Sequence, residues 1–301
     1  MIVTYTEIKR KNKKKYYYRV RSIRNGTKFA KKRIYLGTDL NKKELKAAEQ
    51  KADGELMVLN SILTDEELKI LNKIKKDHSK QPKKTFKNRY EAFTSLFTHD
   101  STAIEGNTLT LQETANLLFE KITPTKNLRE INEVLNHKNA IDHILEYEDD
   151  ITKKFICDIH GFVIRDTLDL DLEDQIGRYR EHQVYIRGVE WVPAPSDQVP
   201  KDMRNLLSWY TKNKNKLHPV VVAVYFHVGF ELIHPFVDGN GRVGRLLLNF
   251  ILHKNGYPMV NIPNIQKNRY YTVLNEAQVQ GDLRPFLEFI IELLSENKVP
   301  F

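Results

Sequence analysis

Cysteine and long apolar runs are what this sequence of 301 residues lacks. Its single cysteine, Cys157, excludes an intramolecular disulfide and favours a reducing compartment. No stretch is apolar enough over its length to span a membrane, and the first residues show no signal-peptide pattern. We therefore expect a cytoplasmic protein that does not enter the membrane. Hydrophobic residues make up 41% of the chain, which is enough for a sizeable core.

Acidic residues are scarce at the N-terminus. The whole chain has a formal net charge of +9, and residues 1–40 alone hold thirteen lysines and arginines against two acidic residues. Two β-prone runs, Tyr16–Arg21 and Phe29–Leu36, flank the pair Asn25-Gly26, which predicts a hairpin. We interpret residues 1–40 as a small basic β-rich arm. An anionic partner such as a nucleic acid and a merely solvated charged face are equal alternatives for it.

The rest of the sequence has the apolar periodicity of helices. The exception is residues 177–200, where Val184–Ile186 and Val189–Val192 predict a short β-hairpin, called the flap below. We therefore predict a mainly α fold, a helical bundle with a β-hairpin flap. Three regions are expected: the arm (1–40), a helical region with a linker at 80–87 (41–94) and a main domain (95–301). The predicted helices cover 42–63, 65–76, 110–121 (begun by a capping box at Thr110 and Glu113), 127–148, 151–167, 201–212, 220–233, 242–254, 268–278 and 283–296.

One segment of twelve residues, 234–245, concentrates the chemistry; it reads His-Pro-Phe-Val-Asp-Gly-Asn-Gly-Arg-Val-Gly-Arg. Gly239-Asn240-Gly241 tolerates positive φ, which lets N–H groups converge into an anion site at a helix N-terminus. Arg242 and Arg245 share one face of the first helical turn, where each cation is unfavourable by about 0.3–1 kcal/mol. The pattern predicts a polyanion site, for example for a triphosphate.

His234 and Asp238 flank this predicted site. A histidine with a pKa near its usual ~6.5 can accept a proton at neutral pH. An aspartate beside phosphates is a natural Mg²⁺ ligand. Alone, each of these residues is explained as a helix cap or a turn residue. Their coincidence within twelve residues indicates a nucleotide site.

At every defining position the same twelve residues resemble the motif of the Fic family, and the resemblance extends over about residues 95–295. It does not cover the arm. It implies a Fic-type helical fold and the transfer of AMP from ATP, with Mg²⁺, to a Ser, Thr or Tyr hydroxyl of a protein substrate.

The resemblance also implies a role for each motif residue. His234 corresponds to the general base and Asp238 to the Mg²⁺ ligand. Asn240, with neighbouring backbone N–H groups, corresponds to the anion hole for the α- and β-phosphates. Arg242 and Arg245 correspond to the ligands of the β- and γ-phosphates.

Three further positions bear on the nucleotide. Gly241 stands where the Doc branch, which transfers phosphate, has a lysine, so it matches the nucleotidyl-transferring branch. Tyr271 matches the position that packs on adenine. Gln278 stands where close relatives often have asparagine; its amide can still pair with the adenine edge, so the base preference is left open. The implied ATP-binding set is Gly239, Asn240, Gly241, Arg242, Arg245, Tyr271 and Gln278.

Upstream, Ser101 is followed four residues later by Glu105 and then by Gly106, which resembles the inhibitory motif of family members with an N-terminal inhibitory helix. The resemblance implies that Glu105 pairs with Arg245 and excludes the γ-phosphate. The alternative is a helix that ends at Glu105 with Gly106 as its cap. The flap segment Gln183-Val184-Tyr185-Ile186 is expected to dock an extended target by strand addition.

Two other functions stay open. Glu105 could position a water molecule for removal of AMP from a modified protein. Alternatively, the basic arm could carry a nucleic-acid-binding function. The sequence does not identify the target protein, the trigger or the oligomeric state, for which a homodimer is one alternative.

Overall fold

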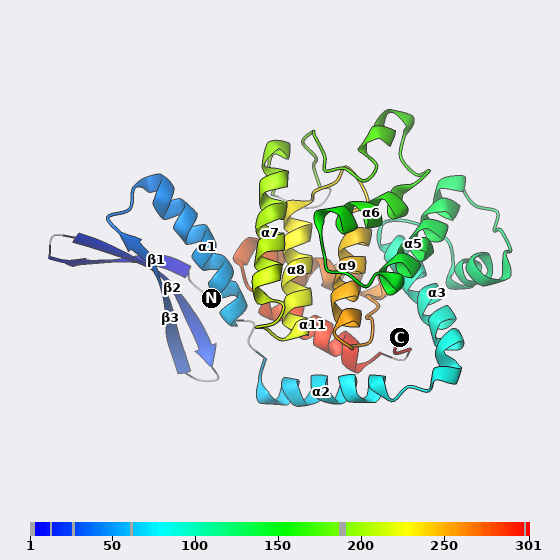
Figure 1. Ribbon diagram of the computed structural model, residues 1–301, viewed down its shortest axis with the longest axis horizontal. Helices are drawn as coiled ribbons and strands as arrows, with labels where there is room; N and C mark the ends of the chain where they lie inside the picture. The colour runs from blue at the N-terminus through cyan, green and yellow to red at the C-terminus, as the bar shows by residue number, and fades with distance from the viewer. Residues whose placement is uncertain (1–3, 13, 26–27, 61–62, 187–190, 298) are drawn as a thin grey trace. The chain divides into compact units, whose positions relative to one another are not determined.

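The computed structural model describes the chain except for residues 1–3, 13, 26–27, 61–62, 187–190 and 298 (Figure 1). It divides into two compact units. The first comprises Met1–Ile62 with Glu276–Pro285, and the second comprises Leu63–Asn275 with Phe286–Phe301. The predicted mainly α class is confirmed. None of the described helices is long and apolar enough to cross a membrane.

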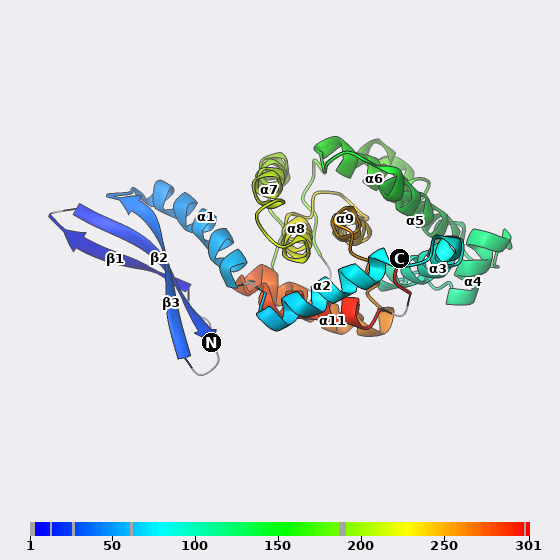
Figure 2. The same cartoon turned by 60° about the horizontal axis from the view of Figure 1, so that its bottom comes forward.

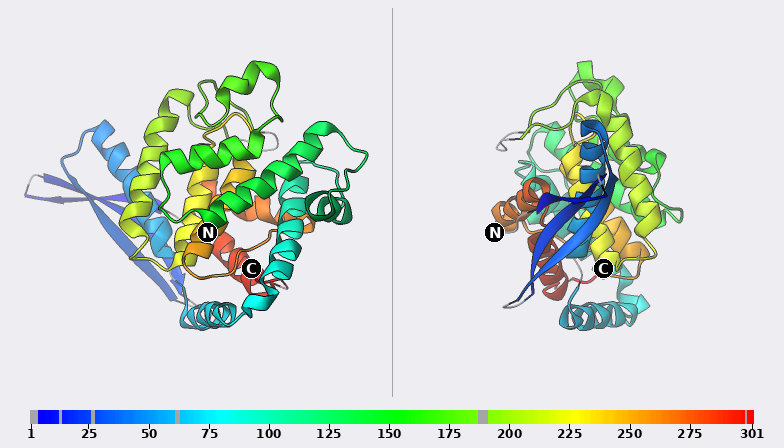
Figure 3. Two further views of the ribbon diagram at one scale, coloured as in Figure 1. Left: turned by 45° about the vertical axis from the view of Figure 1, so that its right-hand side comes forward. Right: turned by 90° about the vertical axis from the view of Figure 1, so that its left-hand side faces the viewer.

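The first unit contains the sheet of the basic arm. Its strands are β1 (Thr4–Lys11), β2 (Lys14–Asn25) and β3 (Lys28–Thr38), in the order β1-β2-β3 and antiparallel. Helix α1 (Lys42–Asn60) contacts β2 and β3 (Figure 3). Arg19 on β2 binds Asp53 on α1 with two hydrogen bonds of 2.7 and 2.8 Å. This contact explains how a sheet too small to be stable alone is supported.

The pairing of β2 with β3 confirms the predicted hairpin, whereas β1 was not predicted. Strand β1 reads TYTEIKRK and lies at the edge of the sheet. Charged residues are characteristic of edge strands, because they discourage pairing with further chains. The same charged residues lower the β-propensity of the segment, so the sequence pattern does not predict the strand.

The second unit is helical, and α8 and α9 lie side by side at its centre (Figures 1 and 2). Helix α7 packs on α8, while α5 and α6 pack on α9. Helix α8 is apolar on nearly every side, as a helix surrounded by others must be. The larger helices are α2 (Asp65–Ser79), α3 (Phe86–Ile104), α4 (Leu111–Ala115), α5 (Leu128–Glu146), α6 (Lys153–Ile164), α7 (Val199–Asn213), α8 (Pro219–Ile233), α9 (Asn240–Lys254), α10 (Lys267–Asn275) and α11 (Arg284–Ser295, whose first two residues belong to the first unit). Short helical turns are η1 (Lys83–Thr85), η2 (Asn116–Glu120), η3 (Leu170–Gln175), η4 (Ser196–Gln198), η5 (Asn264–Gln266) and η6 (Glu276–Gln280, in the first unit).

The flap differs from its prediction. Its described parts, 181–186 and 191–195, contain no strand, and 187–190 lie outside the described residues. The Gln183 side-chain amide instead joins the two limbs by donating to the carbonyls of Val184 and Pro193, both at 3.0 Å. Pro193 and Pro195 lack the N–H groups that a strand ladder needs, so a side chain takes over this role.

The expected linker at 80–87 is also shorter than predicted, because η1 and the first turn of α3 occupy residues 83–87. The Phe86 ring at the start of α3 packs on Phe301, with ring centroids 5.2 Å apart. This long-range contact stabilises a turn that the polar local sequence does not favour. The capping box at Thr110 and Glu113 is confirmed.

We predict that Leu247→Ala lowers the free energy of unfolding by about 2–5 kcal/mol, because a large buried side chain leaves a cavity. Leu247 lies on α9 and is 0% exposed. Leu128→Ala, at a side chain that is 70% exposed, is the matched control and should change stability by less than about 0.5 kcal/mol. Urea unfolding followed by circular dichroism measures both. Equal effects would contradict a core centred on α9.

Candidate active site

A tight turn between α8 and α9 forms the site. Helix α8 ends at Ile233, and His234 follows with a left-handed φ of 51°. Gly239 has φ 77°, and a side chain here would bring its Cβ within 2.7 Å of Ile164. The Asn240 side chain closes the turn, because its amide binds both the N–H and the C=O of Phe236 at 2.9 Å.

This closure corrects one expectation. Of Gly239, Asn240 and Gly241, only Gly239 has positive φ. The other two belong to α9, which starts at Asn240 instead of Arg242. The Asn240 side chain is hydrogen-bonded to the backbone of Phe236 and is not available to an anion. The N–H groups of the first helical turn remain available.

His160 supports the turn from below. Its ring stacks on Phe236 with a centroid distance of 3.7 Å and an interplanar angle of 3°. Nδ1 accepts the N–H of Gly177 at 3.0 Å, so Nε2 carries the proton and donates to the carbonyl of Asp238 at 3.2 Å. Burial lowers the pKa of His160 to about 3, which keeps the ring neutral. This role was not predicted, because in the sequence His160 is a lone histidine outside any motif.

Arg180 joins the flap to the same turn. Its guanidinium is 2% exposed and donates to the carbonyls of His234 (2.8 Å), His182 (3.0 Å) and Ala194 (2.6 Å). Its own N–H donates to the carbonyl of Pro235 at 2.9 Å. The flap is therefore fixed beside His234 through backbone groups.

The start of α9 has the properties of an anion site. The side chains of Arg242 and Arg245 are almost fully buried, at 2% and 1% exposed. Nε and Nη1 of Arg242 and Nη1 of Arg245 have no hydrogen-bond partner in the described part of the chain. Buried donors without partners are costly, and at a helix N-terminus they favour an anion.

Glu105 reaches into this anion site. Helix α3 ends at Ile104, so Glu105 is its C-terminal cap, and Gly106 follows with φ 108°. Oε1 of Glu105 accepts Nη2 of Arg245 at 2.7 Å. A Cβ on Gly241 would stand only 2.4 Å from the same oxygen, so the carboxylate lies directly against the start of α9.

Ser101 holds the same arginine. Its hydroxyl accepts Nε of Arg245 at 3.0 Å, and its carbonyl accepts Nη2 at 2.8 Å. The two contacts with Ser101 and the contact with Glu105 orient the guanidinium from one turn of α3. The geometric pairing expected for Glu105 and Arg245 is therefore present.

His234 is electrically neutral. Burial lowers its pKa to about 4, although the backbone of Glu231 opposes this shift. A neutral imidazole at pH 7 can accept a proton, which is the requirement for a general base.

Asp238 remains ionised for a different reason. Burial would raise its pKa, but Arg242, the Gly239 N–H and Arg129 outweigh burial and lower it. Its Oδ1 accepts Arg242 at 3.2 Å, and its Oδ2 accepts Arg129 at 3.2 Å. The carboxylate is 37% exposed and thus accessible to a cation.

The remaining candidates differ in how close they come to the site. Tyr271 on α10 is 40% exposed, and its pKa is raised by burial and by the charge of Glu105, so the ring lies within the electrostatic influence of the Glu105–Arg245 contact. Gln278 lies on η6 in the first unit and stays a prediction. In the flap, the Tyr185 side chain is 78% exposed, whereas Gln183, Val184 and Ile186 are less exposed.

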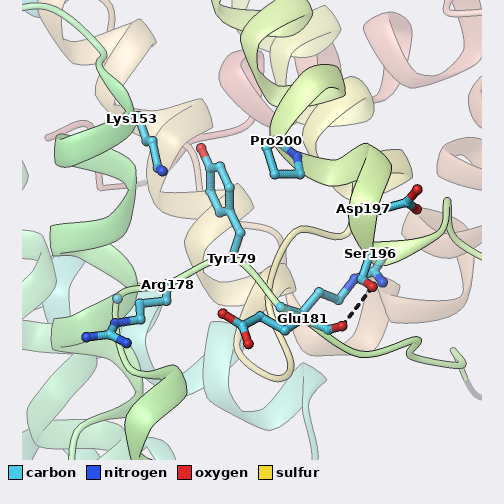
Figure 4. A pocket seen from close by; sticks show the side chains of 9 residues that line it. Lys153, Arg178, Tyr179, Glu181, Ser196, Asp197 and Pro200 are labelled. Atoms are coloured by element: carbon cyan, nitrogen blue, oxygen red, sulfur yellow. Dashed lines mark hydrogen bonds between the residues drawn. The ribbon is translucent and has the colours of Figure 1, made fainter.

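A separate pocket of about 510 Å³ lies at the base of the flap (Figure 4). The ammonium of Lys153 stands 5.0 Å from the centre of the Tyr179 ring, and Ser196 donates to the carbonyl of Glu181 at 2.8 Å. Its charges are mixed, with Lys153 and Arg178 against Glu181 and Asp197. None of the predicted catalytic or phosphate-binding residues lines it.

Comparison with known proteins agrees with this geometry. The model of the Fic/DOC family matches residues 150–252. A Fic family protein from Desulfovibrio desulfuricans, of known crystal structure, is 31% identical with a TM-score of 0.65, over 78% of this chain and 73% of that one. The chain belongs to the Fic family.

Two other relatives support the Fic assignment. A Fic domain containing signaling protein from Bacteroides thetaiotaomicron has a TM-score of 0.68 and 27% identity, over 76% of this chain and 94% of that one. "Protein adenylyltransferase Fic" from Nematostella vectensis is 37% identical over 198 residues, which are 64% of this chain and 45% of that protein. The chain thus spans less than half the length of the curated Fic relative.

A buried carboxylic acid lies behind the Fic motif and was not predicted. Glu231 on α8 is 6% exposed, and its Oε1 has no hydrogen-bond partner in the described part of the chain. Burial raises its pKa to about 8, with Arg245 opposing and Glu105 reinforcing the shift. At neutral pH the group is therefore mainly protonated and uncharged. It does not form an ion pair with Arg245, whose positive charge stays available to other anions.

This assignment predicts how stability depends on pH. Glu231 holds its proton in the folded state up to a pKa of about 8, whereas in the unfolded chain it loses the proton near 4.5. The folded state binds more protons between these values, so the contribution of Glu231 to stability falls as pH rises through this window. Between pH 6 and pH 8, Glu231→Gln should remove a decline of about 1.4 kcal/mol per pH unit.

Urea unfolding at pH 6, 7 and 8 measures the difference in slope between wild type and variant. Glu146→Gln, at an exposed carboxylate at the end of α5, should leave the wild-type slope unchanged. Parallel stability curves for wild type and Glu231→Gln would show that Glu231 is ionised in the folded protein.

Proposed function

We propose that this Fic-family chain is a protein adenylyltransferase that transfers AMP from ATP to a hydroxyl side chain of a protein. The observation that carries the proposal is a set of buried, unpartnered arginine donors at the N-terminus of α9 beside the neutral His234. The name of the Nematostella vectensis relative supports the same activity.

The donors fit the phosphates of ATP. Nε and Nη1 of Arg242, Nη1 of Arg245 and the N–H groups at the start of α9 can each bind a phosphate oxygen. In this proposal Arg242 binds the β-phosphate and Arg245 the γ-phosphate, while Tyr271 and Gln278 contact the base.

Asp238 fits Mg²⁺, because this cation is commonly bound by one or two carboxylates together with phosphate oxygens. Within the described residues no group of three His, Cys, Asp or Glu side chains could form a metal cage of protein ligands alone. When bound, Mg²⁺ would neutralise phosphate charge. Asp238 would exchange its contacts with Arg129 and Arg242 for the cation.

His234 takes the proton from the target hydroxyl in this mechanism. The hydroxyl oxygen forms a bond to the α-phosphorus, and the bond from that phosphorus to the bridging oxygen of pyrophosphate breaks. The arginines stabilise the charge that collects on the leaving group. The Arg180 bond to the His234 carbonyl holds the base in place while a target lies on the flap.

Glu105 inhibits this reaction in our proposal. Its carboxylate occupies the space in front of Gly241 and uses one arm of the Arg245 guanidinium. A γ-phosphate needs the same space and the same charge. Both anions cannot be accommodated together, so bound Glu105 leaves ATP poorly aligned.

The flap, with the segment Gln183-Val184-Tyr185-Ile186, docks the protein substrate. The side chains of Arg180 and Gln183 hold it in place by hydrogen bonds to backbone carbonyls, while the Tyr185 side chain is exposed to solvent. A rigid backbone with an exposed aromatic ring suits binding of an extended segment. The proposed compartment is the cytoplasm, in agreement with the free thiol of Cys157.

We expect His234→Ala to lower AMP transfer at least a hundredfold, because general-base catalysis contributes about 10²–10⁴ in rate. ATP affinity should stay within about threefold of wild type, since the phosphate ligands remain. Transfer of label from α-³²P-ATP to the protein itself measures activity, and calorimetry measures affinity. His253→Ala, at the other end of α9, is the control and should stay active. Transfer above a few per cent of wild type would remove His234 from the base role.

Glu105→Gly should raise the initial transfer rate by about ten- to a thousandfold, because a partly buried ion pair is worth a few kcal/mol and each 1.4 kcal/mol is about tenfold in rate. Arg245→Ala should not reproduce the gain, since it removes a phosphate ligand as well. The double variant should behave like Arg245→Ala alone. Initial rates at saturating ATP compare these proteins.

Glu146→Gly is the matched control, because it also places glycine at an exposed helix end. It should leave the rate unchanged. If Glu105→Gly is no faster than wild type, inhibition by Glu105 is refuted. An AMP-modified protein that loses its AMP with wild type but not with Glu105→Gly would then assign Glu105 to AMP removal.

A further inference from the structure

The excess of positive over negative charge in this protein lies in its first forty residues. Residues 1–40 hold thirteen basic and two acidic residues, whereas the remaining 261 residues hold 35 basic and 37 acidic ones. Residues 41–301 are therefore nearly neutral overall, and the net charge of +9 comes from the arm. Such a concentration of one sign attracts a polyanion.

The acidic residues near the arm are already engaged elsewhere. Glu7 accepts Arg33 at 2.8 Å, and Asp39 accepts the backbone N–H of Lys15 at 2.8 Å. On α1, Asp53 lies 2.7 Å from Arg19. The contacts of Glu7 and Asp53 neutralise Arg33 and Arg19 in the body of the sheet, whereas Asp39 is held by a backbone group.

The end of the β1–β2 ribbon is different. We call Lys9, Arg10, Lys11, Lys14 and Lys15 the basic tip. All five are exposed, and within the described residues no carboxylate lies within 4 Å of their side-chain nitrogens. Among the described side chains, the tip is thus a part of the arm where positive charge stands without a counter-charge.

The strand register makes this arrangement costly for the isolated protein. Arg10 is paired with Lys15, and Lys11 with Lys14. Directly opposed residues of neighbouring strands have Cβ atoms only about 4.5–5.5 Å apart, and like charges there are destabilising. Two successive pairs of this kind are explained if an anion with regularly spaced charges lies across both strands.

An aromatic cluster supports the tip. The rings of Tyr18 and Tyr35 are 5.3 Å apart, and the Lys9 ammonium lies 5.5 Å from the centre of the Tyr18 ring. Tyr35 is 53% exposed. Cross-strand aromatic pairs stiffen a sheet, so the tip presents its cations on a firm ribbon.

We propose that the basic tip binds the phosphate backbone of double-stranded DNA, with the β1–β2 ribbon entering the major groove. The major groove of B-DNA is about 12 Å wide and admits a two-stranded ribbon. The major groove of double-stranded RNA is deep and too narrow for side chains to read. A membrane surface fits less well, because it requires a broad apolar face, and the exposed large apolar side chains described on this sheet are only Ile8 and Tyr35.

The test is the affinity of the full chain for a fluorescein-labelled 20-bp DNA duplex, measured by anisotropy at 50–200 mM KCl. The tip variant replaces Lys9, Arg10, Lys11, Lys14 and Lys15 with glutamine. The logarithm of affinity falls with the logarithm of salt by about 0.9 per phosphate contact. If all five residues contact phosphates, the slope should become shallower by about 4.5, and affinity at 100 mM KCl should fall more than tenfold.

The matched control removes five exposed lysines from the second unit: Lys73, Lys76, Lys80, Lys83 and Lys84. It has the same net charge as the tip variant and should keep the wild-type salt slope. Equal weakening by both variants would overturn the proposal, since charge alone would then explain binding. Unchanged circular dichroism and unchanged self-modification show that the tip variant is folded, and they separate this test from the Fic activity.

Two competitors decide the kind of polyanion. A 20-bp RNA duplex and vesicles with 30% phosphatidylserine should each displace the labelled DNA at least tenfold less well than unlabelled DNA of the same sequence. Equal competition by RNA would overturn entry into the major groove. Stronger binding to the vesicles would replace DNA with a membrane surface as the partner.

Discussion

The guanidinium of Arg245 is the point on which the site depends. It is buried on α9 and is reached from α3 by the hydroxyl and carbonyl of Ser101 and by the carboxylate of Glu105. A buried arginine cannot give up its proton, so every arrangement of the site must supply it with acceptors. Glu231, a further carboxyl that feels the charge of Arg245, is kept protonated by burial and competes little for it. The choice therefore lies between α3 and a bound anion.

The second arginine of the motif, Arg242, has carboxylate partners of its own. Arg242 is held by Asp238 and faces Glu133, so the two arginines of the motif depend on different carboxylates. Displacement of Asp238 from Arg242 and displacement of Glu105 from Arg245 are therefore separate events. Under the proposed function, a nucleotide that displaced only the first would bind without being aligned for transfer.

Much of the site could be predicted because its residues are contiguous. His234, Asp238 and Arg245 lie within one turn and one helix start, where local rules on proline, glycine and helix termini apply. The supporting residues could not be found in this way. His160, Arg180 and Glu231 act through stacking, backbone carbonyls and burial, none of which leaves a periodic pattern. The prediction of strands in the flap was wrong for its described residues for a related reason. Pro193 and Pro195 lack the N–H groups that a strand ladder needs, in a segment whose composition is otherwise β-prone. Strand β1 was missed because edge strands tolerate the charges that disguise them.

Arg180 has a consequence for how such an enzyme can change its targets. Within the described residues, every hydrogen bond of its guanidinium is to a main-chain carbonyl, at His182, Ala194 and His234. Main-chain groups are the same for every residue type, so side chains along the flap can be exchanged without loosening its attachment to the turn that carries His234. Specificity and catalysis are thereby separable in evolution. Under the proposed function, the surface that meets the protein substrate can drift, while the distance between that surface and His234 is inherited unchanged.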